Sequence, residues 1–207
     1  MHDTDWTALA EEIKKNHRAH AVDFSWESDR AMVEIGVLDE FANALAHQGA
    51  MFFYGARHRG EGEDPPDCDA HAGDGTRIGI EITALVDGAS IAAARLGKPY
   101  DWKDWKGLLL PALEKLLRRK DKPKSIQGGP YSQYVYVIFS DKPWLERDYL
   151  EYTIENHMFG VTHLITKTFL FLSYDPFIQR YPCYELRLSP QNAAPADALK
   201  HATELYR

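Results

Sequence analysis

The chain has 207 residues, of which 44% are hydrophobic and 12% aromatic, and its formal net charge is −7. This composition is typical of one globular domain, or of one core with an elaboration, and it excludes an intrinsically disordered chain. A general binder of polyanions is more often basic, so contact with a nucleic acid would have to come from a local basic patch.

Targeting signals and disulfides are not indicated by the sequence. No apolar run approaches the roughly 18 residues of a membrane span. The first residues, Met1 to Asp5, lack the basic and apolar regions of a secretion signal. The two cysteines, Cys68 and Cys183, are far apart and give no disulfide framework. We therefore expect a cytoplasmic protein without membrane contact.

Hydrophobic periodicity predicts helices and strands in a mixed order. The predicted helices are 6–20, 28–46, 108–120, 144–156 and 194–206. The predicted strands are 50–54, 67–72, 76–83, 134–139, 163–173 and 183–188. Loops are expected at 56–66 and 123–130. This order indicates an α/β or α+β fold, in which a central mixed sheet is flanked by helices.

A hairpin with two apposed carboxylates is predicted where the second and third strands meet. If residues 73–75 form a three-residue loop, Asp67 stands opposite Glu81, and Asp69 stands on the same face opposite Gly79, with room beside it. Like charges at this spacing repel each other, and a cation or a proton would relieve the repulsion. The alternative is an acidic hairpin whose charged face is simply solvated.

Two charged residues interrupt the apolar stripes of their helices. Glu34 falls at the centre of the stripe of helix 28–46, and Lys120 falls on the centre line of the stripe of helix 108–120. Either side chain could reach solvent from a helix end. The other possibility is that both point toward the charged face of the hairpin, where burial would require partners.

With these residues in place, the chain resembles the PD-(D/E)XK phosphodiesterase superfamily, which has the restriction-endonuclease-like fold. The resemblance covers about 28–141, and it rests on the order helix, three strands, helix, strand, and on Pro66-Asp67 with Glu81-Ile82-Thr83. It implies a single domain over 1–207. Residues 1–27 would form an N-terminal helix, 28–141 a nuclease-like core, and 142–207 a β-β-α elaboration.

The resemblance also implies a metal-dependent nuclease that acts by preference on DNA. Asp67, Glu81 and the backbone carbonyl of Ile82 would hold Mg²⁺ or Mn²⁺, hard cations that take oxygen ligands. Glu34 matches, by position and face, a glutamate that the first core helix often contributes, and it could bind a second ion through water. The motif lysine is replaced by Thr83, which offers only a hydroxyl.

Some members of the superfamily have this lysine on the following helix instead. Lys120 is the residue best placed for that role here, and Lys115, on the flank of the same helix, is the second candidate. If no lysine reaches the site, the chain would be a non-catalytic interaction module on the same fold, of an immunity or regulatory type. A homodimer is also possible.

Basic residues crowd around the end of the helix predicted at 108–120. Those that we expect to contact nucleic acid are Lys115, Arg118, Arg119, Lys122 and Lys124. The alternative is a solvated helix end, where positive charge is favoured by the helix dipole. A zinc site of His58, Cys68 and His71 is a minor possibility, because Cys68 and His71 would face opposite sides of a strand.

Overall fold

The computed structural model of the protein describes residues 30–60, 62–63, 65–86, 93, 96, 105–140 and 147–190. The chain divides into two compact units, Met1–Val33 with Val86–Lys103, and Glu34–Leu85 with Asp104–Arg207. Nearly all described residues belong to the second unit. The helices predicted at 6–20 and 194–206 lie outside the described residues.

The elements follow the predicted order of helix, three strands, helix and strand. The helices are α2 (Arg30–His47), α4 (Leu109–Lys120), α5 (Arg147–Glu155) and the 3₁₀ turn η1 (Pro123–Ser125). The strands are β1 (Phe53–His58), β2 (Cys68–Ala72), β3 (Arg77–Ala84), β4 (Gln133–Ser140), β5 (Phe159–Val161), β6 (Lys167–Leu172), β7 (Cys183–Glu185) and β8 (Leu188–Ser189).

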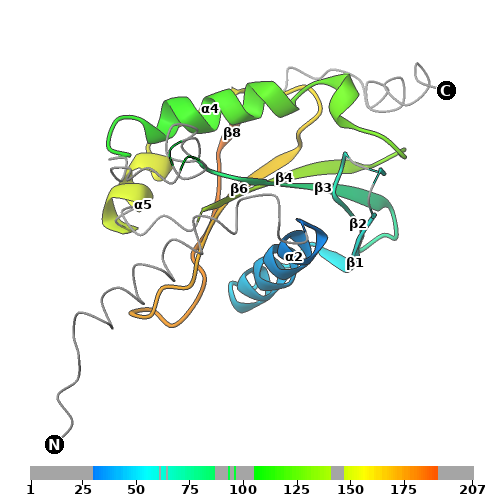
Figure 1. The fold of residues 1–207 in the computed structure, drawn as a ribbon, viewed down its shortest axis with the longest axis horizontal. Coiled ribbons are helices and arrows are strands. Elements are labelled where there is room, and N and C mark those ends of the chain that lie inside the picture. The colour runs from blue at the N-terminus through cyan, green and yellow to red at the C-terminus, as the bar shows by residue number, and fades with distance from the viewer. Residues whose placement is uncertain are drawn as a thin grey trace, which may run out of the picture. The chain divides into compact units, whose positions relative to one another are not determined.

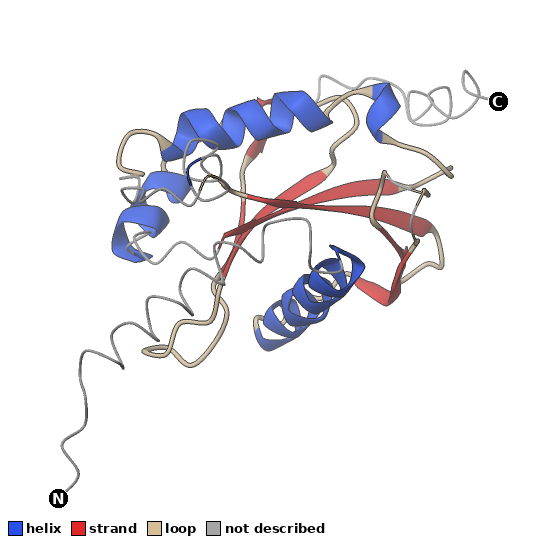
Figure 2. Ribbon diagram, viewed as in Figure 1, coloured by secondary structure: helices blue, strands red, loops and turns tan. Residues whose placement is uncertain are grey.

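Six strands form one mixed sheet in the order β1-β2-β3-β4-β6-β7. The central strands β3, β4 and β6 are parallel, whereas β1, β2 and β7 pair antiparallel at the two edges. Helix α2 covers one face of this sheet, and α4 and α5 lie on the other (Figures 1 and 2). The predicted mixed sheet flanked by helices is therefore confirmed. No helix among the described residues is long and apolar enough to cross a membrane.

Each face of the sheet has its own hydrophobic core. On the α2 face, the buried ring of Phe41 packs against Phe53, Phe169 and Phe171, with ring centroids 5.1–6.0 Å apart. On the opposite face, α4 buries three leucines against β4 and β6 (Leu109, Leu113 and Leu117). The two cores fix the helices on which Glu34 and Lys120 lie.

Strand β5 was not predicted, and the predicted strand 183–188 is divided into β7 and β8, which belong to different sheets. The boundaries of two further strands also differ from the prediction. Strand β1 continues to His58 instead of ending at Tyr54, because a bulge at the positive-φ residue Gly55 lets the polar end of this edge strand remain paired with β2. The strand predicted at 163–173 begins only at Lys167, because the backbone N–H groups of residues 163–165 bond to the Asp121 carboxylate instead of to a neighbouring strand.

Candidate active site

Strands β2 and β3 pair in the predicted register, with Asp69 opposite Gly79. Cys68 pairs with Ile80, and Asp67 and Glu81 are the residues next to this pair. The Oδ2 atom of Asp67 accepts a hydrogen bond of 2.7 Å from the backbone N–H of Ile82, so its carboxylate reaches the strand that carries Glu81. Asp67 is 0% exposed and Glu81 1% exposed. Two carboxylates buried this deeply require partners.

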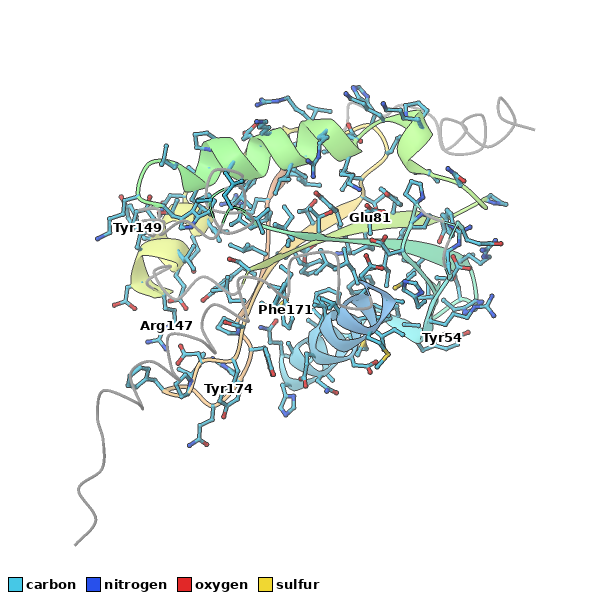
Figure 3. The ribbon with its side chains drawn as sticks, viewed as in Figure 1. Tyr54, Glu81, Arg147, Tyr149, Phe171 and Tyr174 are labelled. Carbon is cyan, nitrogen blue, oxygen red and sulfur yellow. The ribbon has the colours of Figure 1, made fainter. Side chains whose placement is uncertain are left out.

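The partners of Glu81 come from α4 and β4. The Nζ atom of Lys120, the last residue of α4, forms an ion pair with Oε1 of Glu81. The hydroxyl of Tyr134 donates to Oε2 across 3.4 Å. Figure 3 shows Glu81 between the sheet and α4. The prediction that Lys120 points toward the charged face of the hairpin is therefore confirmed.

The end of α4 is held in place by the residue that follows Lys120. The carboxylate of Asp121 accepts backbone hydrogen bonds of 2.7–3.2 Å from His163, Leu164 and Ile165, in the segment that leads into β6. Three bonds from one short segment to a charged acceptor form a strong anchor. The Lys120 ammonium is thus presented from a fixed helix end.

Asp69 has a different environment from the one that the sequence predicted. Its carboxylate accepts hydrogen bonds from Arg77 at 2.8 Å and from the Tyr131 hydroxyl at 2.9 Å. The expected room beside it is absent in this part of the structure, since a Cβ atom on Gly79 would lie 2.9 Å from Pro66. Asp69 therefore stabilises the local structure, and the prediction of an open space there is wrong.

Glu34 is buried, as its place in the α2 stripe predicted, and its partner is His58 at the end of β1. The backbone N–H of Gly60 donates to Nδ1 of His58 across 3.0 Å, so Nδ1 carries no proton. The proton is then on Nε2, which donates to the Glu34 carboxylate at 2.9 Å. The Glu34–His58 contact is thus a hydrogen bond between a carboxylate and a neutral imidazole.

Cys68 is close to carboxylates on both faces of the sheet. Its thiol is buried in the core on the α2 face. Burial, and then the charges of Asp67, Glu34, Glu81 and Asp69, raise the pKa of this thiol far above its usual range. The carboxylates that act on this thiol come from both sides of the sheet, Glu34 from the α2 side and Asp67 with Glu81 from the α4 side.

Asp67, Glu81 and the Ile82 carbonyl offer only oxygen donors, the type of ligand that a hard cation takes. In a strand, the N–H and C=O groups of one residue face the same side, so the Ile82 carbonyl faces the edge where Asp67 lies. Within the described ranges, no three His, Cys, Asp or Glu side chains gather as ligands of one ion. The predicted ligands Asp67, Glu81 and Ile82 do not need a third such side chain.

The residues considered for zinc are dispersed. His58 contacts Glu34, the ring of His71 stacks on Tyr54 with centroids 5.7 Å apart, and Cys68 is a core residue. These contacts give each of the three residues a structural partner, and the zinc hypothesis is not supported.

The basic run lies at the C-terminal end of α4 and just beyond it. All of its predicted members are exposed (Lys115, Arg118, Arg119, Lys122 and Lys124). Arg118 pairs with Glu114 on the same helix at 3.3 Å. The run begins one turn before Lys120, so its positive charges are close in sequence to the residue that contacts Glu81.

Comparison of the chain with protein-family models, with curated proteins and with solved structures gave no match. The candidate site therefore rests on the residues and contacts above. Sequence reasoning did not predict the roles of Tyr134, Asp121 and Arg77. Tyr134 belongs to the strand predicted at 134–139, and no sequence pattern distinguishes it from the other core residues of that strand.

Proposed function

We propose that this protein is a metal-dependent nuclease of the PD-(D/E)XK type. Thr83 occupies the position of the motif lysine, and Lys120 takes over the role of that lysine. The observation that carries the proposal is the ion pair between Lys120 and Glu81, beside a second buried carboxylate, Asp67. Two opposed carboxylates with a lysine ammonium on one of them are the groups that phosphodiester hydrolysis with a cation requires.

Asp67, Glu81 and the carbonyl of Ile82 would hold Mg²⁺ or Mn²⁺. When bound, such an ion lowers the pKa of a coordinated water and polarises the scissile phosphate. Lys120 supplies a positive charge beside Glu81, where it can orient the attacking water and neutralise charge in the transition state.

Tyr134 is a positioning residue for Glu81. Burial and then the nearby negative charge of Glu81 raise the pKa of its hydroxyl well above the usual range, so the hydroxyl remains protonated and continues to donate to Oε2. Lys120 and Tyr134 together restrain both oxygens of the Glu81 carboxylate.

DNA is the proposed substrate because the exposed basic run at the end of α4 adjoins the site. A chain with a net charge of −7 repels a polyanion in general, and a local positive surface is what makes contact with phosphates favourable. Arg118, Arg119 and Lys122 are exposed and lie within two residues of Lys120 in sequence.

The same ion pair also supports a second function. If the Lys120 ammonium serves as the permanent counter-ion of Glu81, it neutralises the carboxylate that would bind the cation. The protein would then be a non-catalytic interaction module that uses this fold.

Cleavage of plasmid DNA with Mn²⁺ distinguishes the two functions. We expect the wild-type protein to cleave, and Asp67→Asn and Glu81→Gln to lower the rate by at least about 100-fold, because each removes a charge needed in the transition state. Glu185→Gln is the matched control, because Glu185 is an exposed carboxylate that pairs with Lys167 on β6. Equal cleavage by all four proteins would contradict the proposal, as would the absence of cleavage by the wild type.

A further inference from the structure

A row of three polar side chains crosses the sheet on the face that α4 covers. The strand register places Glu81 of β3 opposite Tyr136 of β4, and Tyr136 opposite Thr168 of β6. Tyr136 and Thr168 are 0% exposed. Within the part of the chain that the structure describes, neither hydroxyl has a hydrogen-bond partner. A buried hydroxyl without a partner is destabilising, so each such group requires an explanation.

The two hydroxyls differ in their surroundings. Burial raises the pKa of Tyr136 to about 12, and the proximity of Thr83 and Arg119 opposes that rise, although neither contact has the geometry of a hydrogen bond. The phenol is therefore a neutral donor at physiological pH. Arg119 is exposed and adjoins Lys120 in the last turn of α4. Tyr136 is thus beside the proposed catalytic pair, whereas Thr168 is one strand farther away.

We propose that the Tyr136 hydroxyl and the Arg119 guanidinium form a subsite for a phosphoryl oxygen of the substrate, next to the Glu81–Lys120 pair. The identity of the substrate as a phosphodiester rests on the proposed function. A phosphoryl oxygen only accepts hydrogen bonds, and both groups of the subsite are donors here. Arg119 is the exposed member of the subsite, and the anion would reach the buried hydroxyl from the side of this residue.

The subsite gives the Tyr136 hydroxyl a hydrogen-bond partner that the described residues do not supply. The ring of Tyr136 belongs to the hydrophobic core of this face, and only its hydroxyl lacks a partner. Tyr136 is a positioning residue in this account: its hydroxyl holds the phosphate, and Glu81 and Lys120 carry out the chemistry.

Calorimetric titration of inorganic phosphate, in the presence of EDTA, tests the subsite. The wild-type protein should bind phosphate, and Tyr136→Phe should weaken the affinity about tenfold, as expected for the loss of one hydrogen bond to a charged group. Thr168→Val is the matched control, because it also removes a buried hydroxyl without a partner. This variant should bind phosphate as the wild type does. Equal affinities of Tyr136→Phe and wild type would overturn the proposal, and so would the absence of binding by the wild type or an equal loss in Thr168→Val.

Thermal unfolding separates a binding role from a structural one. Both variants lose an unsatisfied hydroxyl, so their melting temperatures should equal or exceed that of the wild type. A lower melting temperature for Tyr136→Phe would show that its hydroxyl stabilises the fold, and would contradict the subsite.

The titration contains no divalent metal and requires no cleavage. It therefore tests the subsite independently of the proposed nuclease activity. If Tyr136→Phe loses phosphate affinity while the wild type cleaves no DNA with Mn²⁺, the subsite stands and the nuclease proposal falls. If the wild type cleaves DNA and Tyr136→Phe binds phosphate normally, the nuclease proposal stands and the subsite falls.

Discussion

Asp67 and Asp69 lie two residues apart and on the same face of the sheet, yet they have different roles. Asp67 accepts the backbone N–H of Ile82 beside Glu81, whereas Asp69 contacts Arg77 and Tyr131. The side chain of Arg59, 7% exposed, also approaches Asp69, with 3.7 Å between Nε and Oδ1. The difference arises from these partners, since the two carboxylates themselves are chemically alike.

Asp69→Asn should lower the free energy of unfolding by about 2 kcal/mol, because it weakens the charged hydrogen bond from Arg77 and leaves Arg59 with Glu63 as its remaining carboxylate partner. Arg57→Gln should change it by less than about 0.5 kcal/mol, since Arg57 is 74% exposed and 3.9 Å from Asp69. Urea denaturation measures both values. Similar losses of stability in the two variants would contradict the structural role of Asp69.

Helical phase predicted that Glu34 and Lys120 turn inward, but not their partners. Lys120 contacts Glu81, as predicted. Glu34 is buried on the α2 side of the sheet and contacts His58, so the prediction that it points toward the charged face of the hairpin is wrong. The hydroxyl of Tyr134 meets Glu81 across 53 positions of sequence. The bond between His58 and Glu34 likewise depends on how β1 meets α2. Pairings of this kind depend on the packing of distant elements, which a periodic pattern does not contain.

Among the elements, β4 and the segment just before it concentrate buried phenols on the α4 face. Burial raises the pKa values of Tyr131 and Tyr136 to about 12, and that of Tyr134 farther still. The value for an unfolded tyrosine is about 10. The folded state therefore binds more protons than the unfolded state above this pH.

These phenols should therefore leave the free energy of unfolding unchanged below about pH 10. They should lower it as the pH rises from about 10 toward 12. Each phenol contributes a loss of up to about 1.4 kcal/mol per pH unit in that window. Urea denaturation at pH 8, 10 and 11 measures the fall, and Tyr134→Phe should make it less steep. An unfolding free energy that is the same at pH 8 and pH 11 would contradict the burial of these tyrosines.

Element boundaries were predictable where the hydrophobic period was regular, as in β3, β4 and α4. They were wrong where polar interactions decide the boundary. β1 continues through Arg57 and His58 because an edge strand tolerates polar side chains. β6 starts late because Asp121 takes the backbone donors of residues 163–165.

For the whole molecule, the sequence predicted the fold class and the register of β2 with β3, and both are confirmed. Nuclease activity, the bound cation and DNA binding remain predictions. The charge distribution is consistent with them, since a chain of net charge −7 has its exposed basic run at the end of α4. A phosphate backbone that approached this run would be next to Lys120.

Lys120 is proposed to have the role of the motif lysine, whose position is occupied by Thr83. This role is tested most directly by removing the lysine at position 120 and introducing one at position 83. Cleavage of plasmid DNA with Mn²⁺ would be measured for wild type, Lys120→Met, the double variant Lys120→Met with Thr83→Lys, and the control Lys106→Met, at an exposed lysine outside the proposed site. Thr83 lies two residues beyond Glu81 on the same face of β3, so a lysine there can reach the same carboxylate.

We predict that Lys120→Met lowers the cleavage rate by about 100-fold or more and that Lys106→Met leaves most of the rate. The double variant should cleave at least about tenfold faster than Lys120→Met alone. Cleavage by Lys120→Met at the wild-type rate would contradict the account.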